Sequence, residues 1–234
     1  MQRFFAGYFL LLVLVLIFSI QCSVAEEYRE HKTISIGKDL RLLTEWRAKA
    51  YTGEHDAESM LPVKLCFTPL DKTFEQQCES FQEFNVFVDL KVVEFARGAI
   101  GSQKGVLFLT NSWGMGGGAT SISLWIYGGG KFINLLPGDT YVPALGTFQL
   151  FPSLQGKSIL VIASPASYLS GALDDPERET LWRPHKYKMK ILTYTPGRRY
   201  ITTNVIETKR KYDPELDIDR VIAAEMEAIK RAVR

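Results

Sequence analysis

Apolar residues recur at every second position over most of this chain after residue 39. Between residues 40 and 50, for example, leucine, tryptophan and alanine alternate with arginine, glutamate and lysine. A period of two indicates a β-strand with one buried face, because successive side chains of a strand point to opposite sides. The residue types at 40–50 would also tolerate a helix, so that segment keeps two interpretations. The pattern as a whole favours folds built mainly from strands.

Shorter runs rich in valine, isoleucine and phenylalanine, which strands prefer, follow at intervals. They occupy residues 62–67, 84–95, 105–110, 147–151, 158–163, 186–191 and 200–207. Residues 120–127 and 131–135 form a further pair, and the three glycines between them predict a β-hairpin. In its first arm Ser121, Ser123 and Trp125 alternate with isoleucine and leucine.

Only the C-terminal segment follows the period of a helix. Its apolar side chains recur every three or four residues and predict a helix at about residues 217–233, with Asp217 as N-cap and basic residues in the last turn. These apolar residues are Ile218, Ile222, Met226, Ile229 and Val233. The expected fold is therefore mainly β: a single antiparallel β-sandwich or open-barrel-like domain with a C-terminal α-helix. The sequence contains no internal repeat of fixed period, so it gives no support for a β-propeller.

The first 25 residues have the layout of a secretory signal peptide. Arg3 precedes an uncharged apolar run at residues 4–20, and small residues at 23–25 would allow cleavage before Glu26. The run is also close to the length of a membrane span, so an uncleaved N-terminal anchor is one alternative. Lipidation at Cys22 is another. All three interpretations place residues 26–234, as a single β-rich domain, outside the cytoplasm, in the periplasm or secreted.

The cysteine count agrees with export. Without Cys22, the chain has two thiols, Cys66 and Cys78. In an oxidising compartment an even pair separated in this way predicts one structural disulfide that closes a short loop. A redox role would favour a CxxC spacing, which the pair does not have.

The formal net charge of +2 conceals an uneven distribution. Residues 178–211 contain ten lysines or arginines and two glutamates, so the rest of the exported chain is net negative. Lys186, Lys188 and Lys190 should share one face of a strand, and Arg183 and His185, which precede it, are further candidate contacts. This basic strip is a candidate contact for an anionic envelope component or an acidic protein. The alternative is that the lysines only block pairing at a sheet edge. Because the net charge of the whole chain is close to zero, it gives no reason to expect that the protein binds nucleic acid.

The glycine-rich stretch at residues 113–118 is the most unusual segment. It superficially matches a dinucleotide fingerprint, but a strand-like run follows where that fingerprint requires a helix. We therefore expect no nucleotide there and interpret the stretch as a loop. Trp113 beside it is a candidate ligand or partner contact, because an exposed ring can stack on a sugar or an aromatic group.

Motifs for catalysis and metal binding are weak or missing. The chain has no nucleophile elbow, no Ser-x-x-Lys, no His-Glu-x-x-His and no EF-hand loop. His185 is the one candidate general base, with Ser164 or Asp174 as partners from a distance, and an acidic run at 174–179 is best explained as a surface loop. We expect no metal and no cofactor.

Taken together, the sequence predicts an exported, non-enzymatic β-domain that binds an envelope component, a partner protein or a ligand. The alternative is an extracytoplasmic hydrolase with a non-local site that includes His185.

Overall fold

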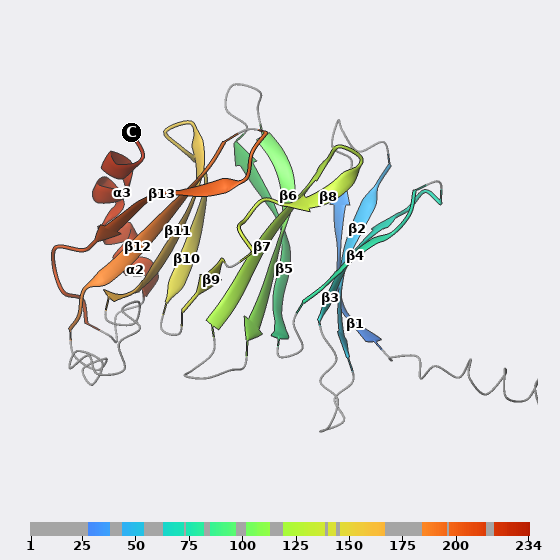
Figure 1. Cartoon of the computed structure of the whole chain (residues 1–234), viewed down its shortest axis with the longest axis horizontal. Coiled ribbons are helices and arrows are strands. Elements are labelled where there is room, and N and C mark those ends of the chain that lie inside the picture. Colours follow the sequence, from blue (N-terminus) through green and yellow to red (C-terminus); the bar gives the residue numbers. More distant parts are fainter. Residues whose placement is uncertain are drawn as a thin grey trace, which may run out of the picture.

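The strands of the protein form three antiparallel sheets, which stand side by side in Figure 1. The structure is a computed structural model that describes residues 28–37, 44–53, 63–72, 74–81, 85–96, 102–112, 119–138, 140–143, 146–166, 184–195, 197–213 and 218–234. We call the sheets N-terminal, central and C-terminal, in the order in which the chain forms them.

Each sheet takes consecutive strands of the chain. The N-terminal sheet contains β1 (Tyr28–Gly37), β2 (Trp46–Gly53), β3 (Lys64–Pro69) and β4 (Gln77–Ser80). The central sheet contains β5 (Asn85–Ala96), β6 (Ser102–Ser112), β7 (Ala119–Gly128) and β8 (Lys131–Asn134), and the short β9 (Tyr141–Val142) also pairs with β7. The C-terminal sheet contains β10 (Thr147–Leu154), β11 (Lys157–Pro165), β12 (Tyr187–Tyr194) and β13 (Tyr200–Glu207).

The same four-stranded up-and-down meander therefore occurs three times. The first strands of the three meanders lie together, because β5 contacts both β1 and β10. The last strands of the first two sheets also meet, because Gln77 of β4 is hydrogen-bonded to Phe132 of β8. Architecture thus repeats here although the sequence shows no repeat of fixed period.

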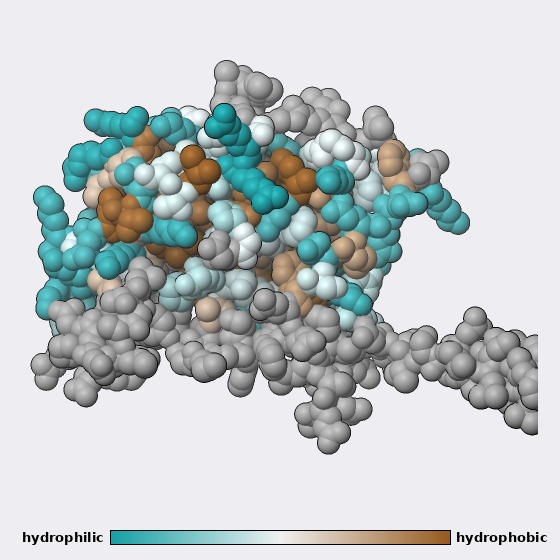
Figure 2. Space-filling model, in the orientation of Figure 1, coloured by the Kyte–Doolittle hydropathy of each residue, from teal (hydrophilic) through white to brown (hydrophobic). Residues whose placement is uncertain are grey.

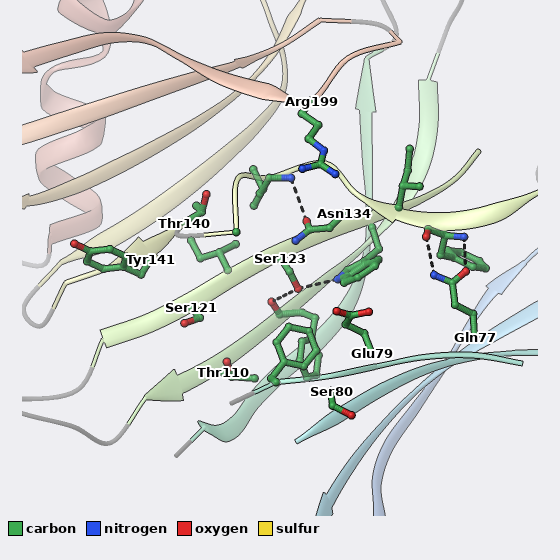
Figure 3. A pocket seen from close by; sticks show the side chains of 18 of the residues that line it. Gln77, Glu79, Ser80, Thr110, Ser121, Ser123, Asn134, Thr140, Tyr141 and Arg199 are labelled. Atoms are coloured by element: carbon green, nitrogen blue, oxygen red, sulfur yellow. Dashed lines mark hydrogen bonds between the residues drawn. The ribbon is translucent and has the colours of Figure 1, made fainter. Parts of the chain in front are cut away.

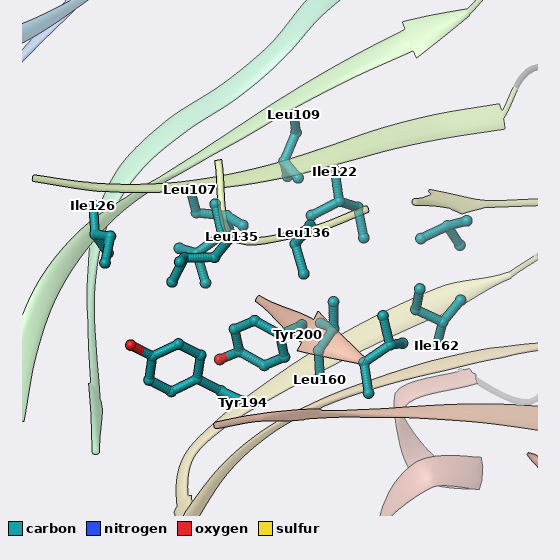
Figure 4. Close-up of a cluster of buried hydrophobic side chains, with 13 residues drawn as sticks. Leu107, Leu109, Ile122, Ile126, Leu135, Leu136, Leu160, Ile162, Tyr194 and Tyr200 are labelled. Atoms are coloured by element: carbon teal, nitrogen blue, oxygen red, sulfur yellow. The ribbon is translucent and has the colours of Figure 1, made fainter. Parts of the chain in front are cut away.

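Two apolar layers hold the stack together. Between the N-terminal and central sheets, an aromatic cluster includes Trp46, Phe67, Trp125 and Phe132. The rings of Phe67 and Phe132 stack with centroids 3.8 Å apart. Between the central and C-terminal sheets the layer is mainly aliphatic, and Figure 4 shows leucines and isoleucines of both sheets facing one another around Tyr194 and Tyr200.

The prediction of a mainly β fold is confirmed. The structure differs from a two-sheet sandwich or an open barrel in having a sheet packed on each face of the central one. The reason is visible in β7, where all five residues from Ile122 to Ile126 are buried. Such a strand needs an apolar layer on both sides, and the central sheet has a sheet on each side, whereas β11 in the C-terminal sheet has the central sheet on one side and the helices on the other.

The two ends of the stack are closed differently. On the N-terminal sheet, polar contacts such as the 2.8 Å ion pair between Lys49 and Glu30 lie on the side away from the aromatic cluster. On the C-terminal sheet, the far face packs against α2 (Ile218–Ala224) and α3 (Met226–Ala232). The face of the molecule in Figure 2 accordingly shows polar side chains that surround separate apolar patches.

The C-terminal helix was predicted as one element, and the structure divides it into two short helices at Glu225. Its predicted apolar face is confirmed at Ile222, Ile229 and Val233, which are buried against the C-terminal sheet. Lys157 Nζ donates a 2.6 Å hydrogen bond to the carbonyl oxygen of Val233 and fixes the end of α3. The predicted N-cap, Asp217, lies outside the described residues.

Other local predictions compare with the structure as follows. The glycine hairpin is confirmed as the β7–β8 turn, where Gly129 and Gly130 have φ of 63° and 85°, the left-handed values that favour glycine. Of residues 40–50, β2 takes only the part from Trp46 onward. Strands β1, β4 and β9 were not predicted, because they are polar or very short.

The predicted disulfide is present. Cys66 on β3 and Cys78 on β4 face each other in the strand register and are bonded, with 2.09 Å between their sulfur atoms. The predicted signal segment, residues 1–25, lies outside the described residues. Within the described ranges, no helix has the length and apolar character needed to cross a membrane.

Candidate functional site

A groove of about 770 Å³ lies where the three sheets come together (Figure 3). Strand β4 and the residue after it form one side, β6 and β7 form the floor, and β8, the segment up to β9 and the turn before β13 form the other side. The residues that line it are Gln77, Glu79, Ser80, Phe81, Phe108, Thr110, Ala119, Ser121, Ile122, Ser123, Trp125, Lys131, Phe132, Ile133, Asn134, Leu136, Gly138, Thr140, Tyr141 and Arg199. Ligand sites in proteins commonly have volumes of about 300–1,000 Å³.

Strand alternation makes the floor of the groove polar. Ser121, Ser123 and Trp125 share one face of β7, and Thr110 lies opposite Ser121 in the β6–β7 register. The N-terminal sheet covers this face around Trp125. The hydroxyl-bearing end remains at the groove, since both serines and Thr110 line it.

Two polar side chains in the walls, Gln77 and Asn134, already form hydrogen bonds with the backbone of the central sheet. The Gln77 side chain donates to the carbonyl oxygen of Phe132 and accepts from its N–H, both at 2.7 Å, and so joins β4 to the edge of β8. Asn134 Oδ1 accepts from the N–H groups of Leu124 and Leu136, at 3.2 and 3.1 Å. These contacts leave the Asn134 amide N–H donors for other partners.

Two threonine hydroxyls of the groove are buried and have no hydrogen-bond partner within the described part of the chain. Thr110 is 1% exposed and Thr140 is 3% exposed, and the Oγ1 atoms of both are among the unpartnered buried atoms. Ser123, in contrast, accepts a 2.8 Å bond from the indole N–H of Trp125. A buried polar group without a partner typically costs about 1–3 kcal/mol, so native proteins rarely keep one without a reason.

Three charged side chains also line the groove, and none of them forms an ion pair with another described residue. Glu79 extends from β4, Lys131 begins β8, and Arg199 comes from the turn before β13. Figure 3 shows Arg199 and Glu79 entering from opposite sides, with Arg199 near Asn134. All three are exposed, so a ligand can reach their charges without displacing an existing partner.

The position of Arg199 is set by its neighbour Tyr200. The Tyr200 N–H donates to the carbonyl oxygen of Leu135 at 2.8 Å, and its hydroxyl lies 2.8 Å from Ser158 Oγ in the buried layer. Burial raises the pKa of the Tyr200 phenol well above its usual value. A neutral, buried and hydrogen-bonded tyrosine therefore holds the turn that carries Arg199 against the central sheet.

His185, the predicted general base, does not line this groove. Its backbone N–H and carbonyl bond to Tyr212 at 3.0 and 2.8 Å, and its ring lies 4.7 Å from the ring of Tyr187. Ser164 is 2% exposed in β11, and Asp174 lies outside the described residues. The hydrolase interpretation thus gains no assembled site from the described residues.

The predicted lysine strip lies on one face of β12 and includes Lys186, the residue directly before this strand. Lys186, Lys188 and Lys190 alternate with residues that pack toward the helices. Glu207 of β13 lies opposite Lys188 and forms a 3.1 Å ion pair with Lys186, so the strip carries less net charge than its sequence indicates. None of the three lysines lines the groove.

Trp113 and Arg183, the other predicted contact residues, lie outside the described residues, as does the acidic run at 174–179. Among the described residues, no group of three or more histidine, cysteine or acidic side chains could hold a metal ion. The groove residues were missed in the sequence because they are individually ordinary. One signal was available: Ser121 and Ser123 place hydroxyls on the same strand face as Trp125.

No family model matches the chain, and comparison with curated proteins and with solved structures likewise found no match.

Proposed function

We propose that this chain is an extracytoplasmic, non-enzymatic binding domain, and that the groove where the three sheets come together holds its ligand. The observation that carries the proposal is the pair of buried, unpartnered hydroxyls of Thr110 and Thr140 in the wall of a ligand-sized groove. A bound polar ligand would supply the missing hydrogen bonds and recover part of their cost.

The construction of the groove supports a binding role. Its walls come from β4, β8 and the turn before β13, which are held by part-buried or buried hydrogen bonds and by the disulfide between β3 and β4. A site on such elements is preorganised, so little conformational entropy is lost when a ligand binds. The volume suits a small ligand or a short segment of a polymer, rather than the broad surface that a folded partner protein covers.

The extracytoplasmic location rests on two features. The N-terminal residues have the pattern of an export signal. The Cys66–Cys78 disulfide is a bond that persists mainly in oxidising compartments.

A blocking variant tests the groove. Ser121→Trp places a large ring on the floor, and Ser153→Trp makes the same change at an exposed position of β10 that does not line the groove. Protein purified from cells would be mixed with tetragalacturonate, cellotetraose, tetra-alanine and decanoate, and probe binding read from saturation-transfer NMR. We expect at least one probe to bind the wild type and Ser153→Trp but not Ser121→Trp.

Binding of no probe, or equal binding to Ser121→Trp, would overturn the groove as the site. The NMR spectra also report whether a probe is converted. Conversion that is lost in His185→Ala would overturn the non-enzymatic part and favour the hydrolase.

A further inference from the structure

The geometry points to a saccharide that carries an acid group, such as a uronic-acid oligosaccharide, as the ligand of the groove. This inference rests on the proposed function and specifies its ligand class. Four properties of the groove support it: the chemistry of its unpartnered hydrogen-bonding groups, the exposed ring of Tyr141, the position of its cations, and the blocked edge of β8.

The hydrogen-bonding groups that the fold leaves without a partner at the groove match a polyhydroxylated ligand. The Thr110 and Thr140 hydroxyls each donate and accept, the Asn134 amide donates, and the Glu79 carboxylate accepts. A sugar hydroxyl also donates and accepts, so it can satisfy any of these groups. A fatty chain would leave all of them unpaired, which disfavours a lipid.

An exposed aromatic side chain beside these polar groups also favours a saccharide ligand. Tyr141, from β9, is 50% exposed at the groove, whereas the other tyrosines in the described part of the chain are buried or half-buried. The C–H face of a pyranose ring is apolar and packs on an aromatic ring, while its hydroxyls remain at the edge. Tyr141 can therefore support a ring whose hydroxyls reach the polar wall.

The cations indicate an acid group on the saccharide. Arg199 presents its guanidinium near the Asn134 amide, so several N–H donors converge on one side of the groove (Figure 3). Lys131 adds a second positive charge without an ion-pair partner among the described residues. Glu79 lies on the opposite side. An arginine fork is well suited to a carboxylate, and charge-assisted bonds of this kind are stronger than neutral ones.

An extended peptide is a poorer fit. Peptides that bind grooves between strands usually pair with the backbone of a sheet edge. The outward N–H and carbonyl of Phe132 on β8 are already bonded to the side chain of Gln77, both at 2.7 Å. That contact blocks this part of the edge and leaves side chains as the recognition groups.

The test compares tetragalacturonate with its methyl ester, which keeps the rings and removes the charge. Calorimetry on protein purified from cells should show tighter binding of the acid, about tenfold or more at low salt, with a difference that shrinks as salt is added. Arg199→Gln should remove most of this difference. The matched control, Arg198→Gln, changes the neighbouring exposed arginine that does not line the groove and should preserve it.

The outcomes separate this inference from the proposed function. If acid and ester bind equally and both are blocked by Ser121→Trp, the acid group is wrong and the groove remains the site. If tetra-alanine binds and neither saccharide does, the saccharide class is overturned and the binding role remains. If Ser121→Trp affects no probe, both proposals fail.

Discussion

The hydroxyl of Thr110 gives the sharpest test of the physical reasoning, because the protein should become more stable when this group is removed. Thr110→Val keeps the shape of the side chain and replaces a buried, unpartnered hydroxyl with a methyl group. An unpaired buried polar group costs about 1–3 kcal/mol, so the variant should gain on the order of 1 kcal/mol of unfolding free energy. For a domain of this size, that corresponds to a rise in Tm of about 2–4 °C.

The matched control is Ser123→Ala, which removes a hydroxyl from the same groove floor. Ser123 Oγ accepts the 2.8 Å bond from Trp125, so its loss leaves the buried indole N–H without a partner. We expect a loss of about 1–3 kcal/mol in this variant.

Urea unfolding followed by tryptophan fluorescence, without ligand, measures both changes. A second measurement on the same proteins links stability to binding. Thr110→Val should weaken the binding of tetragalacturonate, because the hydroxyl that destabilises the free protein pairs with ligand. A fall of about 1 kcal/mol or more in the unfolding free energy of Thr110→Val, the size of the cost of losing a satisfied hydrogen bond, would show that the hydroxyl is satisfied within the fold and would refute the reasoning.

Three further predictions concern the scaffold. A Cβ at Gly146 would lie 2.8 Å from two backbone oxygens. Gly146→Ala should therefore lower the unfolding free energy, measured in urea, by about 1–3 kcal/mol. The control Gly138→Ala, at a position with open space around it, should change the unfolding free energy by less than about 1 kcal/mol. Burial raises the folded-state pKa of Tyr200, so its contribution is complete below the unfolded pKa near 10 and is lost as pH rises above it. Tyr200→Phe should therefore be less stable than wild type at pH 7 and lose less stability between pH 9 and about pH 11 in thermal melts; parallel pH profiles would contradict this. Replacing Cys66 and Cys78 by serine should lower the unfolding free energy by about 3 kcal/mol, and an unchanged urea midpoint would refute that.

The sequence predicts the strands better than it predicts their stacking. Alternation reports that one face of a strand is buried, and it correctly marked the β7–β8 hairpin and β12. It does not report which other sheet covers that face. In β7 the polar Ser123 alternates with apolar residues, yet it is only 5% exposed because the N-terminal sheet lies over this face.

The groove was hidden from the sequence for the same reason. Its walls come from β4, β8 and Arg199, which are distant in the chain and adjoin only after the three sheets pack. Strand β4 has no apolar alternation that would mark it as a strand. The basic strip, in contrast, is easy to see in the sequence. The structure reduces its net charge, because Glu207 from the neighbouring strand lies among its lysines.

Methyl NMR is the most direct test that the groove is the ligand site. Ile122, Ile133 and Leu136 line the groove, whereas Val161 and Ile229 lie in the layer beneath the C-terminal helices. With these methyl groups labelled, tetragalacturonate should shift the signals of the three groove residues and leave the other two in place. Shifts confined to Val161 and Ile229, or no shift at a saturating concentration, would contradict the assignment of the groove as the binding site.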